Sequence, residues 1–397
     1  MAPGSGGPLK SLLGLKEGSR ELAGLLSLCA EGPVAWHFLE GLRDGDLWEE
    51  CTPLIQAQLL QVPSRGAPLR LVARAEVREF SMRGARGRKL RKRFIQYLLE
   101  QCRQVPGLGG LRESACWLDL IPQIEQLAGP LLAEVPDEDL GWPFVALARL
   151  CEAQGDRPRG TYWSARAVAV LQARLGAEHL DTATAYNNLA AAYHQSGHHA
   201  QAEQLYLNAL TIREQQLGAE HPHLVTVLTN LAGACRNQDK LELCLSYLQR
   251  AADIVGMERR ESLPLLMQLA EAYLRGEQTE LAASTCRRAL ALIETEDPNR
   301  GFLLQSLAMV LHKSGQPGDG HHWMSEAVEL QRRFFGSEHP ALGTTLNNWA
   351  VLHYLDGDMP RSRQLFEEAL KIRLDALGPN NPETLATAAN LEAVNQS

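Results

Sequence analysis

The sequence predicts an all-α protein: a right-handed superhelix (α-solenoid) of paired helices, preceded by a small, mostly helical, winged-helix-like unit. Three observations lead to this prediction. A Leu- or Trp-centred motif recurs at near-constant spacing, each copy has the apolar pattern of two short helices, and similar linkers separate several copies. A fixed period of this length is typical of stacked structural repeats.

The period is read from a Leu or Trp that is mostly followed by Ala. It occurs at Leu147, Leu189, Leu231, Leu269, Leu307, Trp349 and Leu391. The steps between these positions are 42, 42, 38, 38, 42 and 42 residues. We therefore predict an array over 141–396, with six helix pairs and a C-terminal capping helix.

The second copy shows the two predicted helices most clearly. One face of its first helix carries apolar or small residues at helical spacing: Tyr186, Leu189, Ala190 and Tyr193. Gly197 then breaks the helix, and Gly218 closes the second helix as a predicted left-handed C-terminal cap. Small residues such as Ala190 and Ala202 allow the helices to approach, while Tyr193 and Tyr206 fill the space between them.

The linkers read LGAEHL at 175–180, LGAEHP at 217–222, FGSEHP at 335–340 and LGPNNP at 377–382. A recurring Glu-His pair could hold a metal ion or perform acid/base chemistry. We interpret it instead as punctuation, because Gly ends one helix and Pro222 or Pro340 prevents its continuation. Copies one repeat apart are also too distant for shared ligation at about 2 Å.

The order large-x-x-Leu-Ala-x-x-Tyr…Gly…Ala-x-x-x-Tyr-x-x-Ala resembles the tetratricopeptide repeat. The period, the doubled asparagines at 187–188 and 347–348 and the LGxEHP linker resemble its kinesin-light-chain subtype. This resemblance covers about 141–396. The copies at 231–257 and 269–295 depart from it, since Asp239 and Glu277 replace the turn glycine and leave the bend there less defined.

The chain before the array is divided into a disordered N-terminus at 1–16, the winged-helix-like unit at 17–105 and a helical linker at 106–140. Predicted elements of the unit are a helix within 17–29, a helix running into a strand at 47–62, a strand leading to a helix at 69–80, and an amphipathic helix at 88–105. The phrases GPVAW, LVARAEVREF and DEDLGWPF are similar to the segment before the repeats in bacterial STAND (NB-ARC-type) sensors. This similarity implies the C-terminal arm of such a sensor without its NTPase module.

Several classes of chemistry lack the residues they need. The nearest look-alike to a phosphate-binding loop, GSGGPLKS at 4–11, has Leu9 before Lys10-Ser11 and loses an amide at Pro8. The eight cysteines are scattered without a CxxC pair, and the His pairs at 198–199 and 321–322 are interpreted as surface histidines. We expect no enzyme activity, no cofactor and no metal. We also expect a cytoplasmic protein without membrane insertion, because no apolar run approaches the ~20 residues of a membrane span.

Charge separates the two parts of the chain. Residues 1–104 carry 16 Lys and Arg against 11 Asp and Glu, while the remainder is acidic. Seven cations are concentrated in RGARGRKLRKR: Arg83, Arg86, Arg88, Lys89, Arg91, Lys92 and Arg93. They are either a solvated helix start or a patch for nucleic acid, an acidic protein or an anionic surface. The acidic array disfavours sequence-specific DNA binding.

The first helices of successive repeats line the concave side of such a solenoid. Their candidate groove residues are Asn187, Asn188, His194, Thr229, Asn230, Arg236, Gln268, Glu271, Gln305, His312, Asn347, Asn348 and Tyr354. Amides both donate and accept hydrogen bonds, so this row suits the backbone of an extended peptide. The alternative is that Asn188, Asn230 and Asn348 bind the neighbouring repeat and hold the curvature.

The leading hypothesis is a non-enzymatic scaffold that binds a peptide or partner protein in this groove. One alternative is a regulatory or sensor fragment whose basic N-terminal unit docks onto nucleic acid or a partner NTPase. A kinesin-light-chain-like cargo adaptor is a further alternative implied by the resemblance. It is weakened because residues 1–140 lack the sustained heptads with which that adaptor joins its motor.

Overall fold

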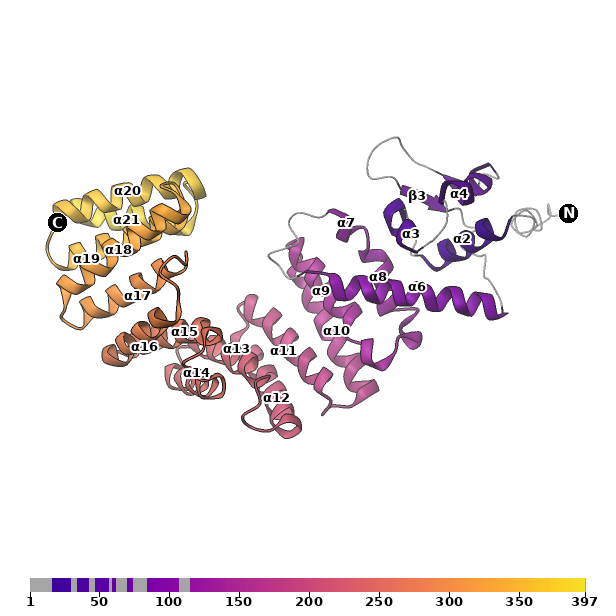
Figure 1. Cartoon of the computed structure of the whole chain (residues 1–397), viewed down its shortest axis with the longest axis horizontal. Coiled ribbons are helices and arrows are strands. Elements are labelled where there is room, and N and C mark those ends of the chain that lie inside the picture. The colour runs from indigo at the N-terminus through magenta and orange to yellow at the C-terminus, as the bar shows by residue number, and fades with distance from the viewer. Residues whose placement is uncertain are drawn as a thin grey trace. The chain divides into compact units, whose positions relative to one another are not determined.

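The computed structural model describes residues 16–29, 34–42, 47–56, 59–61, 70–73, 84–106 and 115–396 (Figure 1). The chain forms two compact units, Met1–Ile212 and Arg213–Ser397. None of the described helices combines the length and the apolar character that a membrane span requires.

The first unit begins with short helices and a small sheet. The helices are α2 (Glu17–Leu28), α3 (Trp36–Leu42) and α4 (Leu47–Gln56), and the strands are β1 (Val34–Ala35), β2 (Leu60–Gln61) and β3 (Arg70–Ala73). The strands form an antiparallel sheet in the order β1-β3-β2. The predicted helix-to-strand step at 47–62 is confirmed, whereas β1 within GPVAW was not predicted. The helix expected after β3 falls outside the described residues.

The basic helix of this unit is also amphipathic, as predicted. Helix α6 (Gly84–Gln104) buries Phe94, Leu98, Leu99 and Cys102. It contacts α2, α8 (Ile121–Ala128) and α9 (Trp142–Ala153), and α7 (Ala115–Leu118) precedes α8. One hydrophobic core extends from Leu22 in α2 to Leu171 in the first helix pair. The N-terminal helices and the first repeat therefore fold as one body within this unit.

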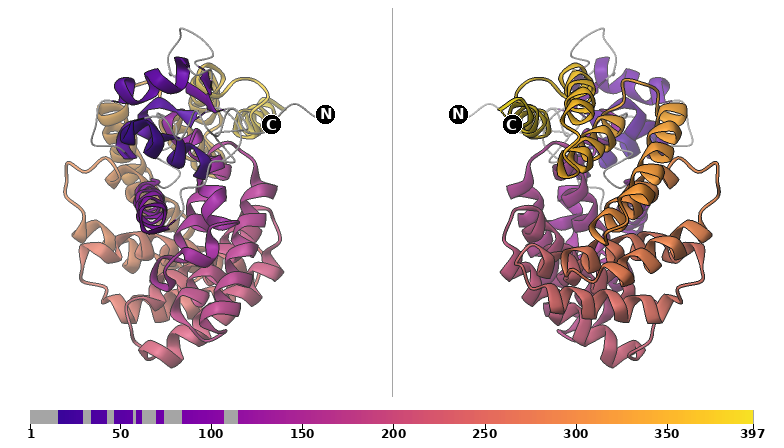
Figure 2. Two further views of the ribbon diagram at one scale, coloured as in Figure 1. Left: turned by 90° about the vertical axis from the view of Figure 1, so that its right-hand side faces the viewer. Right: turned by 90° about the vertical axis from the view of Figure 1, so that its left-hand side faces the viewer.

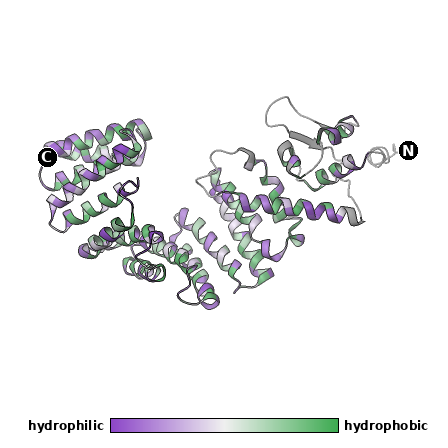
Figure 3. Cartoon of the chain, viewed as in Figure 1, coloured by the Kyte–Doolittle hydropathy of each residue, from purple (hydrophilic) through white to green (hydrophobic). Residues whose placement is uncertain are grey.

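The remaining helices form consecutive pairs (Figure 2). In order they are α9, α10 (Arg157–Leu175), α11 (Leu180–Gln195), α12 (His199–Leu217), α13 (Leu224–Arg236), α14 (Leu241–Val255), α15 (Leu263–Arg275), α16 (Thr279–Leu292), α17 (Arg300–Lys313), α18 (Pro317–Phe335), α19 (Pro340–Leu355), α20 (Met359–Leu377) and α21 (Pro382–Gln396). Apolar and polar residues are interspersed along the helices (Figure 3). The all-helical array of pairs confirms the predicted fold class, and α21 is the predicted unpaired last helix.

The linker glycines differ in one respect from the predicted cap. Gly218 has φ +93° and its N–H donates to the Glu214 carbonyl at 2.9 Å. Three equivalent glycines, Gly176, Gly336 and Gly378, combine positive φ with ψ of 160°, 172° and 167°. These angles lie outside the left-handed helical region, in an extended region that only glycine adopts without large strain. The requirement for glycine was predicted correctly, but not the conformation.

The two shorter repeats make the same turn without glycine. Asp239 and Glu277 adopt φ of +58° and +59°, whereas the equivalent positions Gly197, Gly315 and Gly357 have φ near +80°. An L-residue with a side chain is strained in this region, by roughly 1–2 kcal/mol. The bend therefore forms in every repeat, at a local energetic cost in these two.

Replacing Asp239 or Glu277 with glycine is expected to raise the free energy of unfolding by about 0.5–1 kcal/mol, because relief of backbone strain outweighs the larger entropy of glycine when unfolded. Urea denaturation of the single variants measures this gain. The reverse change Gly197→Asp serves as the matched control and is expected to destabilise. Equal stability of all three variants and the native chain would show that these turns store no strain.

Candidate partner-binding groove

The recurring histidine of the linkers accepts a backbone hydrogen bond at the start of the next repeat, and His179 and His339 thereby cap α11 and α19. Nδ1 of His179 accepts a hydrogen bond from the backbone N–H two residues later at 3.1 Å, and His221 and His339 do the same at 3.2 Å. In the fourth linker, Asn381 Oδ1 accepts from the Glu383 N–H at 2.9 Å. From the sequence, we assigned the helix boundaries in these linkers to Gly and Pro and did not predict a capping role for the histidine. The sequence does contain a signal for this role, because the fourth linker has Asn, a preferred capping residue, in place of His.

We expect His179→Ala to lower the free energy of unfolding by about 1 kcal/mol, since a first-turn amide of α11 loses its acceptor. His179→Asn should retain most of the stability, because Asn381 already fills this position in the last linker. Thermal unfolding of both variants distinguishes a cap from a solvent-exposed side chain. Equal loss in the two variants would contradict the capping role.

The doubled asparagines occupy different surroundings. Asn187 is buried. Its equivalent Asn347 accepts hydrogen bonds at Oδ1 from Thr387 Oγ1 at 3.2 Å and from Asn390 Nδ2 at 3.3 Å, both in α21. The first asparagine of a pair therefore serves the packing of repeats, as the structural alternative anticipated, although at Asn347 rather than Asn348.

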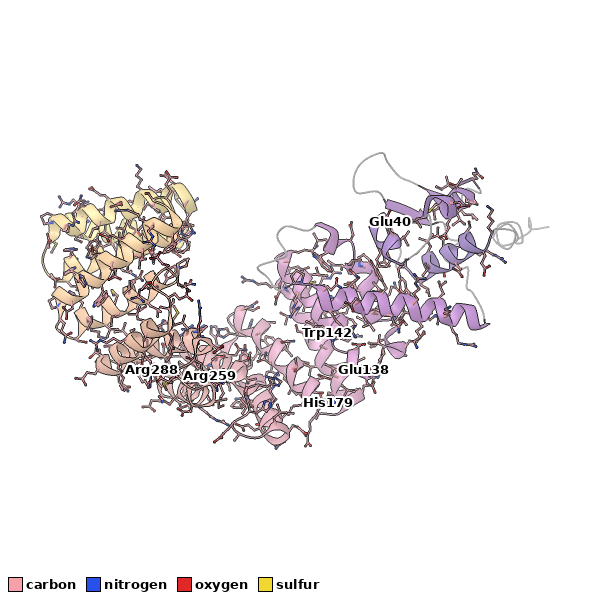
Figure 4. All side chains as sticks on the ribbon, viewed as in Figure 1. Glu40, Glu138, Trp142, His179, Arg259 and Arg288 are labelled. Carbon is pink, nitrogen blue, oxygen red and sulfur yellow. The ribbon has the colours of Figure 1, made fainter. Side chains whose placement is uncertain are left out.

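The second asparagine of the first pair lies beside open space. Asn188 is half-buried and lines two cavities of about 180 Å³ and 260 Å³ between α9 and α11. Within the described part of the chain, no hydrogen bond satisfies its side-chain amide. We call this the α9–α11 groove, lined by Trp142, Val145, Arg149, Thr184, Asn188 and Ala191. Glu138 and Trp142, at its rim, are labelled in Figure 4.

Apolar and charged groups are both present in this groove. Val145, Ala167 and Leu171 contribute apolar walls to it. The Arg149 guanidinium is held by a hydrogen bond from Nη1 to the Val105 carbonyl at 2.9 Å. The groove thus combines an apolar floor, a positioned cation and an amide that lacks an intramolecular partner, which is the usual composition of a ligand site.

In the second unit, several candidate groove residues bind each other or the next repeat. Arg236 in α13 pairs with Glu271 in α15 at 3.0 Å, and Glu271 also pairs with Arg275. Gln305 in α17 accepts from Thr345 of α19 at 2.5 Å. The first helices of adjacent repeats contact one another here, α15 with α17 and α17 with α19. These polar side chains consequently stabilise the array itself.

The remaining candidates have mixed environments. Thr229 donates to carbonyls of its own helix, Asn348 accepts from Asn347 at 3.3 Å, and His194 lies 3.1 Å from His199 between their Nδ1 atoms. Asn230 and Gln268 are half-buried, while Tyr354 is 36% exposed. His312 belongs to a cluster with His321 and Asp356. The expectation that the His321-His322 pair is a plain surface pair is therefore wrong for His321.

A recurring inter-repeat contact escaped sequence reasoning. Gln331 is fully buried in α18, and its side-chain amide lies 2.7 Å from Thr345 Oγ1. Forty-two residues later in the sequence, Arg373 of α20 donates to Thr387 Oγ1 at 2.5 Å and to the Glu383 carbonyl at 2.8 Å. Each bond joins the second helix of one repeat to the first helix of the next. From the sequence alone, a long polar residue in a second helix is expected to lie on the surface. This contact becomes recognisable only when equivalent positions of successive repeats are compared.

The predicted basic patch is only partly paired. Arg83 lies outside the described residues, and nothing is described of the Arg86 side chain. Arg91 pairs with Glu134 at 3.0 Å, Arg93 interacts with other groups of the chain, and Arg88, Lys89 and Lys92 form no ion pair with the described residues. A cavity of about 840 Å³ runs along α6, lined by Arg88, Arg91, Lys92, Arg103 and the carboxylates of Glu134 and Asp139.

Part of the helix-pair array matches a known repeat model. The tetratricopeptide repeat model matches residues 139–215, 302–374 and 342–397. The unmatched stretch between these ranges contains the two shorter copies. A clustered mitochondria protein homolog of Ajellomyces capsulatus is 29% identical over 145 residues, which is 34% of this chain and 12% of that protein. The chain thus spans about an eighth of the length of this curated relative.

Two solved structures match the chain, the first over its full length. A Signal Transduction ATPase with Numerous Domains with a tetratricopeptide repeat sensor, from Pyrococcus horikoshii, is 14% identical with a TM-score of 0.50; the match covers 100% of this chain and 63% of that one. The TPR-like repeats of a Podosopora anserina protein described as a kinesin light chain are 22% identical with a TM-score of 0.45, over 50% of this chain and 99% of that one.

Proposed function

We propose that this chain, which matches the tetratricopeptide repeat over residues 139–215 and 302–397, is a non-enzymatic interaction scaffold that binds a peptide segment of a partner protein in the α9–α11 groove. Tetratricopeptide repeats imply protein partners in general terms. The observation that supports this particular site is the Asn188 amide, which borders two cavities and has no hydrogen-bond partner among the described residues.

The groove chemistry favours an extended peptide. A carboxamide can accept from a peptide N–H and donate to a peptide C=O, so it recognises backbone irrespective of sequence. The apolar wall at Val145 and Leu171 then offers a place for one apolar side chain, and Arg149 offers a cation beside it. Two such hydrogen bonds and one buried side chain contribute about 4 kcal/mol, roughly half of the −8 kcal/mol of a micromolar complex, so further contacts along the peptide must supply the rest.

The test begins with selection of binding peptides from a random library displayed on phage, using the whole chain as bait. We expect Asn188→Ala to weaken the selected peptides about tenfold, which corresponds to about 1.4 kcal/mol. The stability of the variant should not change, because Asn188 has no intramolecular hydrogen bond to lose. Isothermal titration calorimetry measures the affinity, and urea denaturation measures the stability.

Two controls define the outcome. Gln204→Ala changes an exposed residue of α12 and should leave the affinity unchanged. Asn187→Ala changes the buried neighbour and should reduce stability more than Asn188→Ala does. Peptides that bind Asn188→Ala as tightly as the native chain would refute the groove as their site.

A second candidate is that the N-terminal unit docks an acidic partner along α6. Arg88, Lys89 and Lys92 are cations without an ion pair in the described part of the chain, beside the cavity along that helix. The similarity in fold to a STAND ATPase extends over the full chain and supports a sensor-arm role of this kind. If an acidic partner still binds in 200 mM salt, and also binds the charge-reversal variant Arg88→Glu/Lys92→Glu, electrostatic docking at α6 is excluded.

A further inference from the structure

A cluster of imidazole, indole and carboxylate groups lies near the ends of α17, α18 and α19, wholly within the second unit. We call it the edge lock; its members are His312, His321, Trp349, His353 and Asp356. His312 lies in the last turn of α17, His321 near the start of α18, and Asp356 follows α19 directly. The side chains of His312, His321 and Asp356 are 12%, 24% and 31% exposed.

One carboxylate joins two helices in this cluster. His312 Nε2 lies 2.9 Å from Asp356 Oδ1, and His321 Nε2 lies 2.7 Å from Asp356 Oδ2. Burial raises the pKa of Asp356, but the hydrogen bonds from His321 and His312 outweigh burial and hold this pKa below its ordinary value. The carboxylate therefore stays ionised over the range in which histidines titrate, and it accepts from both imidazoles.

The hydrogen bond from Trp349 determines which ring nitrogen of His321 carries the proton. Its indole Nε1 lies 3.0 Å from His321 Nδ1, and an indole N–H can only donate. Nδ1 of His321 is therefore the acceptor, and the single proton of the neutral ring resides on Nε2, where it is donated to Asp356. The donor atoms of His312, His321 and Asp356 lie within 4.8 Å of one another, close enough for a metal ion. A metal would, however, need the Nε2 lone pair that this tautomer does not offer.

A second proton on His321 cannot be accommodated in this arrangement. It would attach to Nδ1, where it would face the Trp349 N–H, so the hydrogen bond between them must break. The lock then loses the Trp349–His321 hydrogen bond between α19 and α18. His312 differs, because its Nε2–H···Asp356 bond is compatible with a proton on Nδ1.

A second imidazole packs against His321 in this cluster. The His353 ring lies 4.3 Å from the His321 ring, and its Nε2 is buried without a hydrogen-bond partner among the described residues. Burial, then His321 and Arg361, lower the pKa of His353, while Asp358, 3.2 Å from its Nδ1, works in the opposite direction. The groups facing His321 are thus His312 from α17, Trp349 and His353 from α19, Asp356 from the turn, and, through His353, Asp358 and Arg361 at the start of α20.

We propose that the edge lock is a proton-responsive contact, closed while His321 is neutral and opened when His321 takes up a second proton and releases Trp349. The closed form binds fewer protons than the open form, so acidification favours opening. His312 is also one of the predicted groove residues, so opening changes the surroundings of a member of that row. The lock is a property of the isolated chain and does not depend on the α9–α11 groove.

The experiment follows Trp349 directly, without any partner. The whole chain is labelled with 5-fluorotryptophan, and Trp349→Phe identifies the Trp349 signal among the seven tryptophans by ¹⁹F NMR. We expect this signal to shift between pH 7.5 and 5.5. Amide exchange in α19, corrected for intrinsic rates, should show more frequent opening at pH 5.5 than at pH 7.5, by at most about tenfold per pH unit for the uptake of one proton.

Two neighbouring histidines give the matched controls. His321→Gln keeps a neutral N–H donor toward Asp356 but cannot titrate, so its Trp349 signal should not depend on pH. His322→Gln changes the exposed neighbour and should respond as the native chain does. A native Trp349 signal that is constant from pH 7.5 to 5.5 would refute the proposal. Stoichiometric binding of Zn²⁺ at pH 7.5 that is abolished by His312→Ala would overturn it as well, because the cluster would then be a metal site.

Discussion

Arg373→Ala is expected to lower the free energy of unfolding by about 3 kcal/mol and to release α21. Arg373 is 5% exposed, and besides Thr387 and the Glu383 carbonyl it donates to Thr344 Oγ1 at 3.0 Å. Hydrogen bonds to a charged donor contribute about 1.5–3 kcal/mol each, and the buried stem adds packing. The unpartnered Nε of this guanidinium reduces the total.

The position of Arg373 determines where the loss should appear. In a linear array each repeat contacts only its neighbours, so the last helix depends on the contacts from α20. Hydrogen exchange should therefore report opening of α21 first, and urea denaturation should report the lower total stability.

Comparison with two other residues tests the mechanism. Arg373→Gln reproduces the side chain that the preceding repeat has at Gln331, and it should recover part of the lost stability. Arg363→Ala removes an exposed arginine of the same helix and should change stability by no more than about 0.5 kcal/mol. Similar effects of Arg373→Ala and Arg363→Ala would show that the buried contacts do not hold α21.

The periodicity was sufficient to predict the fold, because it is set by residues within one repeat. Leu189 and Ala190 lie on a face that must be buried, and Gly197 marks a turn, so local spacing already implies a helix pair. The strand β1 could not be predicted in this way. Its two residues pair with β3, which lies more than 30 residues away in the sequence, and nothing in its own composition specifies that partner.

In the candidate groove, the sequence did not show which of two adjacent polar residues is available for binding. Asn187 and Asn188 are identical and adjacent, but successive helical residues point about 100° apart. One side chain is consequently buried and the other borders the α9–α11 groove. The row of candidates was correct in placing polar residues on the first helices. Assigning packing or binding to each member required knowledge of what the next repeat presents to it, as Thr387 does to Asn347.

Tyr206→Ala is expected to have the largest effect on stability, about 3–5 kcal/mol. Tyr206 is 2% exposed in α12, and the sequence predicts that its ring lies between the helices of the second repeat. Truncation removes the ring from a close-packed core and leaves a cavity whose backbone walls cannot close. Thermal unfolding or urea denaturation measures the loss. Tyr206→Phe keeps the ring and is the control, with an expected change below about 1 kcal/mol.

The same pair of variants gives a pH test of this burial. Burial raises the pKa of the Tyr206 hydroxyl to about 12. The phenol of an unfolded chain ionises near pH 10, so above that pH the unfolded state loses a proton that the folded state retains. The contribution of the Tyr206 phenol to the free energy of unfolding is therefore complete below pH 10 and is lost as the pH rises toward 12. The native chain should lose about 2 kcal/mol more than Tyr206→Phe over this interval, and parallel curves for the two proteins would contradict a buried phenol.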